Sequence, residues 1–193
     1  MMAAGGELPG INQGVMSGPL ASSHANSFRI PIQPGELFAV DLGGVVNRYH
    51  ANVCRSYTYG EPSEKTMRMC EHSKGGVQLL CQIAKDGHAV AEAARTLRNY
   101  YREVGIWDYR QWVGGYELGI AFPPDWVGEW LFNVDGESDQ GVFEAGMVTN
   151  FESVFVDFNP LSPGIGVNID TIVYGQEGAQ ALSRVDMMPI VVG

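Results

Sequence analysis

Alternating and β-branched apolar positions predict two neighbouring strands in the first third of the chain. The short run Leu37–Val40 and the stretch from Val45 to Tyr59, rich in β-branched and aromatic residues, both have strand character. Gly43 and Gly44 lie between them and favour a turn, so we expect an antiparallel pair joined there. The first 35 residues show little apolar periodicity and many Gly, Pro, Ser and Asn residues, which predicts irregular structure.

The pattern then changes to a helical one. One helix is expected from Pro62 to about Ala84, with an interruption at Gly75 and Gly76, and a second from Ala89 to Val104. After residue 107 the periodicity returns to two. The further strands are expected at Trp112–Val113, Leu118–Phe122, Val148–Phe158, Val167–Tyr174 and Pro189–Val192. Strands, a helical pair and then more strands predict the α+β class, in a single domain over residues 1–193.

Charge and composition narrow the function. The 12 Lys and Arg residues are scattered and stand against 22 Asp and Glu residues, a formal charge of -10, which argues against binding to nucleic acid or to an anionic membrane. No apolar run reaches the roughly 18 residues that a membrane helix needs, and the N-terminus has neither a basic start nor an apolar core. Three cysteines without a Cys-x-x-Cys pair are expected to be buried, reduced thiols. We therefore predict a cytoplasmic protein.

Polar residues inside apolar strands are the candidates for chemistry, because an unpaired buried charge is costly. Asp41 ends an apolar strand, and alternation puts His50, Asn52 and Cys54 on one face of the next. Glu152 lies within an aromatic strand. A turn-stabilising Asp, a solvated outer face and a water-facing edge Glu would explain the same residues without any function.

The glycine-rich segment from Gly114 to Trp126 is a further candidate. Its glycines let a backbone approach a ligand closely, and Pro123 and Pro124 make its exit rigid, although a glycine-rich turn between strands explains it almost as well. The loop from Pro123 to Ala145 is long, acidic and contains tryptophans, so we expect it to face a substrate.

Taken in order, these segments resemble the signature of the pita-bread superfamily, which contains creatinase, prolidase, aminopeptidase P and methionine aminopeptidase. The matching stretches are Ser17–His24, Gln33–Leu37 with Asp41–Gly43, and Phe143–Val148 with Phe151–Glu152. The similarity runs from Met2 to Val192. The resemblance implies a curved antiparallel sheet with helices on its outer face. Members usually have helices before the position of Met2, so we expect this chain to lack the first helices of the fold.

The metallopeptidase members of this superfamily hold their metal ions with two Asp, one His and two Glu. By the resemblance, Asp41 and Glu152 match the first Asp and the first Glu, whereas the second Asp position is Asn52 and the His position is Tyr116. The last ligand falls at residue 169 or 170, where only Asp170 has a ligand side chain. Asn offers a neutral carbonyl and Tyr is a poor ligand at neutral pH, so we predict no dinuclear metal centre.

The ectoine hydrolase branch resembles this chain more closely than creatinase, which uses a His at the position of Tyr116. The matching residues are Gly43-Gly44, Arg48-Tyr49-His50, Arg55, Gly115-Tyr116 and Pro123-Pro124-Asp125-Trp126 to Glu129. The resemblance implies a metal-independent hydrolase, without a cofactor, that cleaves an amide or amidine C–N bond in a small substrate.

Such a hydrolase needs a base for water or a carboxylate nucleophile, a donor for the developing oxyanion and an acid for the leaving nitrogen. We assign Glu152 or Asp41 as the base, Tyr116 as the donor and His24 as the acid. A structural hydrogen bond explains His50 as well as a place in the substrate pocket does. The residues expected to line that pocket are His50, Asn52, Asp125 and Trp126.

Two other functions remain open. Asp41, Glu152 and Asp170 would hold a single Mn or Mg ion in a metal-dependent Xaa-Pro aminopeptidase or dipeptidase. Alternatively, the chain is a catalytically inactive binding module, because the superfamily includes pseudoenzymes that keep the cleft. The expected partner is a small molecule or a short peptide, and the resemblance implies a homodimer.

Overall fold

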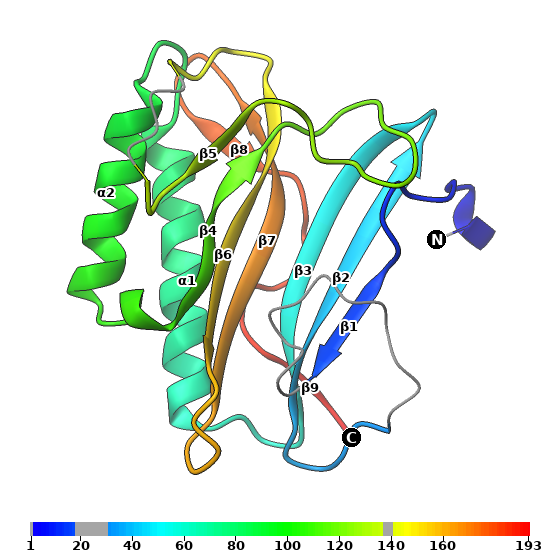
Figure 1. Cartoon of the computed structure of the whole chain (residues 1–193), viewed down its shortest axis with the longest axis vertical. Helices are drawn as coiled ribbons and strands as arrows, with labels where there is room; N and C mark the ends of the chain where they lie inside the picture. Colours follow the sequence, from blue (N-terminus) through cyan, green and yellow to red (C-terminus); the bar gives the residue numbers. More distant parts are fainter. Residues whose placement is uncertain (1, 18–30, 137–140) are drawn as a thin grey trace.

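The structure, a computed structural model, describes residues 2–17, 31–136 and 141–193 (Figure 1). The described strands are β1 (Gly14–Ser17), β2 (Leu37–Val46), β3 (Tyr49–Tyr59), β4 (Arg110–Tyr116), β5 (Leu131–Asn133), β6 (Val148–Asp157), β7 (Gly164–Tyr174), β8 (Ala179–Ala181) and β9 (Ile190–Val192). The α-helices among these residues are α1 (Glu64–Ile83) and α2 (Val90–Glu103), and short 3-10 turns lie at Met2–Ala4 and Trp107–Tyr109. This order of strands, a helical pair and more strands confirms the α+β class.

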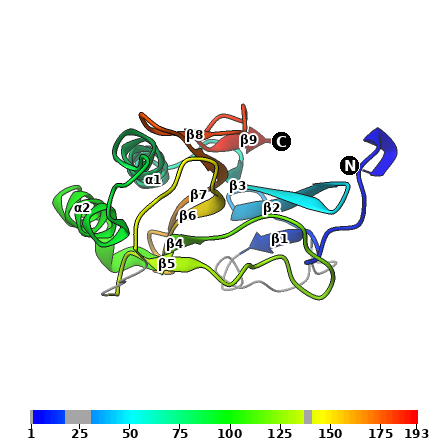
Figure 2. The ribbon, with the colours of Figure 1, turned by 90° about the horizontal axis from the view of Figure 1, so that it is seen from above.

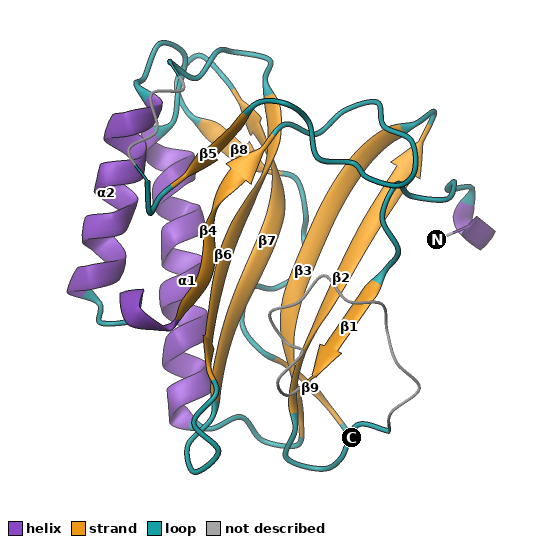
Figure 3. Ribbon diagram, viewed as in Figure 1, coloured by secondary structure: helices purple, strands orange, loops and turns teal. Residues whose placement is uncertain are grey.

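The strands form one sheet in the order β1-β2-β3-β7-β6-β4-β5, with β8 beside β7 and β9 beside β3. Every pairing in it is antiparallel except that of β3 with β9. Seen from one end, the sheet is an arch, with β1 and β2 in one limb and β4, β5 and β6 in the other (Figure 2). Helices α1 and α2 pack outside the second limb, so the concave face is left for a site (Figure 3).

A side-chain cap explains where helix α1 begins, and two glycines explain how closely the two helices pack. The Ser63 hydroxyl accepts a 3.1 Å hydrogen bond from the Thr66 N–H and caps α1. Helix α1 is continuous through Gly75 and Gly76, so the expected interruption there is wrong. A Cβ at these two positions would overlap the hydroxyls of Tyr100 and Tyr101, so the glycines serve the close approach of α2. No helix within the described residues is long and apolar enough to span a membrane.

The turn between β2 and β3 lies later than expected. β2 continues through Gly43 and Gly44, which pair with Asn52 and Ala51, and the chain reverses at residues 47 and 48. Both turn residues have positive φ, 49° and 65°, as a tight hairpin turn requires. The prediction of a turn at Gly43 and Gly44 is therefore wrong, and Gly43 makes room for a tryptophan described below.

Two further expectations change. Residues 118–122 do not form a strand but contribute isolated bridges, among them Tyr49 with Ile120. Pro123 and Pro124 follow directly and cannot donate to a sheet ladder, which explains why no strand propagates there. Within the first 35 residues, residues 14–17 form strand β1, which pairs with β2, although irregular structure was expected there.

All three cysteines are free, and Cys54 and Cys70 are buried as expected.

A buried ion pair joins β3 to β7 at the outer face. The Arg55 guanidinium donates to Asp170 Oδ2 at 2.6 Å, and the Ser183 N–H donates to Asp170 Oδ1 at 3.0 Å. Arg55 also donates to the carbonyls of Cys54, Ile169, Val185 and Asp186 and to the Ser183 hydroxyl. Because both side chains are almost fully buried, each depends on the other to compensate its lost hydration.

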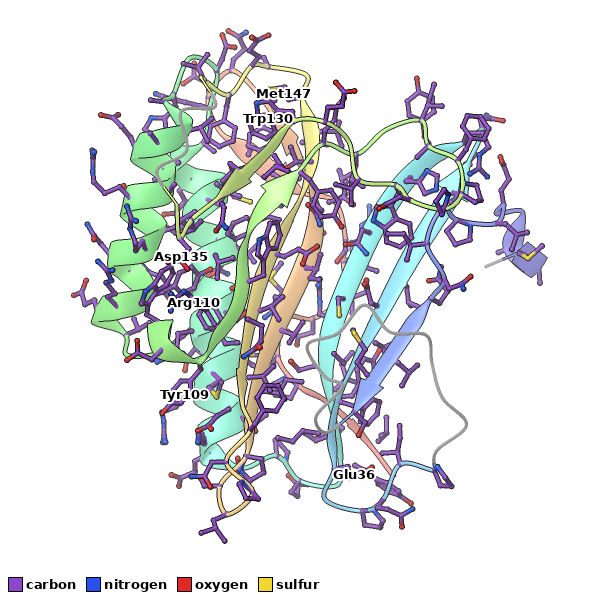
Figure 4. The ribbon with its side chains drawn as sticks, viewed as in Figure 1. Glu36, Tyr109, Arg110, Trp130, Asp135 and Met147 are labelled. Atoms are coloured by element: carbon purple, nitrogen blue, oxygen red, sulfur yellow. The ribbon has the colours of Figure 1, made fainter. Side chains whose placement is uncertain are left out.

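Removing one partner of this pair should be strongly destabilising. We expect Asp170→Asn to lower the free energy of unfolding by about 3–5 kcal/mol, because it leaves the Arg55 charge buried and unpaired. The matched control is Asp135→Asn, which breaks the more exposed Arg110–Asp135 pair labelled in Figure 4 and should cost at most about 1 kcal/mol. Urea unfolding measures both, and equal losses would contradict the structural role given to Asp170.

Candidate functional site

A row of paired residues crosses the concave face and carries the candidate acids. Residues directly opposite each other in neighbouring strands project to the same face. The strand registers join six residues into one row across β1, β2, β3, β7, β6 and β4: Gly14, Asp41, Cys54, Ile169, Glu152 and Gly114. Asp41 and Glu152 therefore share a face three strands apart, about 14 Å along the sheet, and its curvature brings their side chains closer.

Asp41 is held by Asn52 from the neighbouring strand. The Asn52 Nδ2 donates to Asp41 Oδ1 at 2.6 Å and, more weakly, to the Leu42 carbonyl at 3.5 Å. The backbone of Asn52 is fixed by Thr171, whose Oγ1 accepts from the Asn52 N–H at 2.8 Å and donates to the Asn52 carbonyl at 3.1 Å. The amide group thus points its donor end at the carboxylate.

Glu152 is buried, with 4% of its surface exposed, and has neutral hydrogen-bond donors around it. Asn150 Nδ2 donates to Glu152 Oε1 at 2.8 Å, and Tyr116 also donates to the carboxylate. Burial, followed by the negative charge of Asp41, raises the pKa of Glu152 to about 7, although the bonds from Tyr116 and Asn150 act to lower it. A carboxylate with this pKa exchanges protons near neutral pH, as a general base must.

Tyr116 connects Glu152 to the loop that crosses the concave face of the sheet. Its backbone N–H donates to Asn150 Oδ1 at 2.9 Å, so Asn150 holds both Tyr116 and Glu152. Its hydroxyl accepts from Trp126 Nε1 at 3.2 Å. Burial, followed by the Glu152 charge, raises the pKa of Tyr116 above its ordinary value, so the phenol keeps its proton.

The loop of residues 117–130 spans the two limbs of the arch at one end (Figure 2). Trp126 on this loop is buried and lies against Gly43 of β2, where an added Cβ would come within 2.5 Å of the indole ring. Asp125 Oδ1 accepts from the N–H groups of Trp126 and Val127 at 2.7 and 3.0 Å. The Asp125 carboxylate, which is predicted to bind substrate, therefore forms hydrogen bonds to the backbone of its own turn.

A side chain at residue 43 should displace the indole. We expect Gly43→Ala to lower the free energy of unfolding by about 1–3 kcal/mol, because the new methyl group overlaps a ring that is packed on several sides. Gly44→Ala is the matched control, since a Cβ there meets no atom closer than 4.0 Å. Thermal unfolding of the two variants checks this, and an equal effect at both positions would contradict the packing argument.

Both ring nitrogens of His50 form hydrogen bonds within the protein. Its Nε2 accepts from the Gly10 N–H at 2.9 Å, and its Nδ1 lies 2.9 Å from the Arg48 carbonyl, so Nδ1 carries the proton and both ring nitrogens are occupied. The ring is 5% exposed and tilts against Trp126 with centroids 5.9 Å apart. These bonds agree with the structural interpretation of His50, and its place in the substrate pocket stays a prediction.

The alternative single-ion set is not brought together. Ile169 pairs with Glu152 and lies on the concave face, so Asp170, one residue on, projects to the outer face and binds Arg55. Asn52 and Tyr116 direct hydrogen-bond donors toward the carboxylates of Asp41 and Glu152. A metal ion beside these carboxylates would need lone pairs from residues 52 and 116 instead. Across the described ranges no three His, Cys, Asp or Glu side chains group as metal ligands. The donor set does not fit a metal centre.

Three other residues complete the account of the site. His24 lies outside the described residues, so its proposed role as an acid stays a prediction. Asn150 was missed, although its place two residues before Glu152 in a strand puts it on the same face. Cys54 lies between Asp41 and Ile169 in the row of paired residues on the concave face. Burial, followed by the negative charges of Asp41 and Glu152, raises the pKa of the Cys54 thiol.

Comparisons with known proteins agree with this architecture. The family model of metallopeptidase family M24 matches residues 1–177. Among curated proteins, the ectoine hydrolase of Halomonas elongata is 30% identical over 148 residues, which are 76% of this chain and 36% of that protein. The Xaa-Pro dipeptidase of Pyrococcus furiosus is 25% identical over 188 residues, 96% of this chain and 51% of that protein. The chain thus spans between about a third and a half of these relatives.

Solved structures agree on the fold. The X-Pro aminopeptidase of Thermotoga maritima superposes with a TM-score of 0.82 at 18% identity, over 99% of this chain and 51% of that one. The prolidase of Pyrococcus furiosus gives a TM-score of 0.78 at 25% identity, over 94% of this chain and 51% of that one. The pita-bread fold, with its curved antiparallel sheet and outer helices, is confirmed.

Proposed function

Because the chain belongs to metallopeptidase family M24, we propose that it is a hydrolase of the ectoine hydrolase and Xaa-Pro dipeptidase type that cleaves a C–N bond in a small substrate without a metal ion. The observation that carries this proposal is the hydrogen-bonded group of Glu152, Tyr116 and Asn150. This group stands on the concave face opposite Asp41 and supplies a base and a donor from the chain's own side chains.

The proposed reaction uses these residues in turn. Glu152 takes a proton from a water molecule, whose oxygen attacks the amide or amidine carbon. The Tyr116 hydroxyl donates a hydrogen bond to the atom on which negative charge develops. The leaving nitrogen then receives a proton, from His24 or from Glu152 itself, and the C–N bond breaks. Asp41 and Asn52, joined by their 2.6 Å hydrogen bond, would contact the substrate from the opposite limb.

A metal-dependent Xaa-Pro dipeptidase is the second candidate. Its support is the match to the Pyrococcus furiosus enzyme over 96% of this chain. The side chains argue against it, because Asp170 lies on the outer face and the remaining carboxylates, Asp41 and Glu152, already accept donors from Asn52, Tyr116 and Asn150. A homodimer, implied by the resemblance, and a cytoplasmic location, predicted from the cysteines and the N-terminal sequence, belong to the proposal as well.

Product detection tests this function. The purified protein would be incubated with ectoine, creatine and a panel of Xaa-Pro dipeptides, and C–N cleavage products would be sought by mass spectrometry, with Glu152→Gln as the matched inactive control. We expect products with at least one small substrate and none with the control. Binding of a panel compound without cleavage would instead support the inactive binding module.

A further inference from the structure

The hydroxyl of Tyr116 sits between two groups that together decide which way its proton points. Indole nitrogen can only donate, so in the 3.2 Å contact with Trp126 Nε1 the Tyr116 oxygen must accept. A phenol has one proton, and Glu152 accepts it on the other side. The bonds therefore run in one direction, from Trp126 to Tyr116 to Glu152.

We propose that Trp126 is a positioning residue, which occupies the lone pair of Tyr116 and so holds the Tyr116 hydroxyl as a proton donor beside Glu152. This inference rests on the proposed function, in which Tyr116 stabilises the negative charge of the transition state. Without the indole N–H, the hydroxyl would be free to accept from other donors or to turn away from the cleft.

Trp126 is well fixed for this purpose. It has 4% of its surface exposed, and its ring lies on the flat backbone of Gly43. The backbone N–H of Trp126 is held by the Asp125 carboxylate at 2.7 Å, and the ring of His50 lies against the indole. An indole held on these sides keeps the direction of its N–H, which a solvent-exposed donor would not.

The other end of the chain of bonds is fixed by Asn150. Its amide donates to Glu152 Oε1 at 2.8 Å and accepts from the Tyr116 N–H at 2.9 Å. The carboxylate and the phenol are therefore tied to one side chain from β6. When Glu152 takes the proton of water it attracts the Tyr116 proton less strongly, and that proton turns to the substrate while Trp126 still occupies the lone pair.

The hydrogen bond can be tested without a substrate. The chain has four tryptophans, so labelling with ¹⁵N-tryptophan gives four indole N–H resonances, and the one lost in Trp126→Phe belongs to Trp126. We expect Tyr116→Phe to move this resonance. The control is Trp130→Phe, the same change in the same loop (Figure 4). The Trp130 ring packs on Phe132 and Phe143, so its replacement should leave the Trp126 resonance in place. An unmoved resonance in Tyr116→Phe would overturn the inference.

A double-mutant cycle tests the positioning role on a substrate found by product detection. We expect Trp126→Phe to lower kcat by about 10- to 100-fold with KM within about twofold, because only the donor's direction is lost. In the Tyr116→Phe background the same change should lower kcat by less than about twofold. Equal losses in both backgrounds would overturn the inference. Turnover absent from every arm would overturn the proposed function, and the indole resonance would still decide whether Trp126 holds Tyr116.

Discussion

Replacing Glu152 by Gln is expected to lower kcat by about 10³-fold or more while the protein stays folded. The amide has the same shape as the carboxylate and still accepts from Asn150, but it cannot take a proton from water. Measuring kcat beside circular dichroism separates loss of chemistry from loss of structure. Full activity in this variant would remove Glu152 from the mechanism.

The same variant should also change how stability depends on pH. The folded state raises the pKa of Glu152 from an ordinary 4.5 to about 7, so folding favours the protonated acid. That stabilisation is fully present below about pH 4.5 and is lost as the pH rises through about 7. Relative to wild type, Glu152→Gln should gain about 3 kcal/mol of unfolding free energy between about pH 4 and pH 8.

The control is Glu103→Gln, the same change at an exposed position at the end of α2. Urea unfolding across this pH range should show the relative gain for residue 152 and none for residue 103. A gain of equal size in both variants, or in neither, would contradict the account of Glu152 as a buried acid whose ionisation costs stability.

Introducing the ligands that the resemblance places at residues 52, 116 and 169 should create a metal site. The triple variant Asn52→Asp, Tyr116→His and Ile169→Glu places two carboxylates and an imidazole beside Asp41 and Glu152 on the concave face. Without metal, we expect the variant to be less stable than wild type, because its added carboxylates lie close to Asp41 and Glu152 in a buried site. With Mn at 100 times the Kd of the variant for Mn, we expect its free energy of unfolding to rise by about 2.7 kcal/mol.

Calorimetric titration with Mn and thermal unfolding measure this change, and the matched control adds Glu152→Gln to the triple variant to remove one original ligand. The control should lose most of the affinity. Tight, stoichiometric Mn binding by the wild-type protein would show that neutral residues do not prevent metal binding here.

Sequence reasoning reached the fold and the two carboxylates because they depend on local patterns. Strand alternation places His50, Asn52 and Cys54 on one face, and all three are buried in β3. The order and spacing of the motif segments were enough for the pita-bread resemblance. These features follow from residue type and spacing, which the sequence contains directly.

Other features depend on contacts between distant residues. Gly43 and Gly44 have the composition of a turn, but Gly43 makes room for Trp126 on another loop. Whether Ile169 or Asp170 faces the cleft depends on the register of β7 against β6, because a shift of one residue reverses every side chain. The ring nitrogens of His50 meet Gly10 and Arg48, and the contact with Gly10 needs the folded chain.

The most direct test of the central claim is the rate of C–N bond cleavage by metal-depleted protein. Protein dialysed against EDTA, with its residual metal content determined by mass spectrometry, would be compared with the same protein given Mn or Mg. If Glu152 and Tyr116 perform the chemistry, the rate stays within about twofold in all three conditions. Cleavage that disappears in EDTA and returns with Mn would contradict the claim and restore the metal-dependent peptidase.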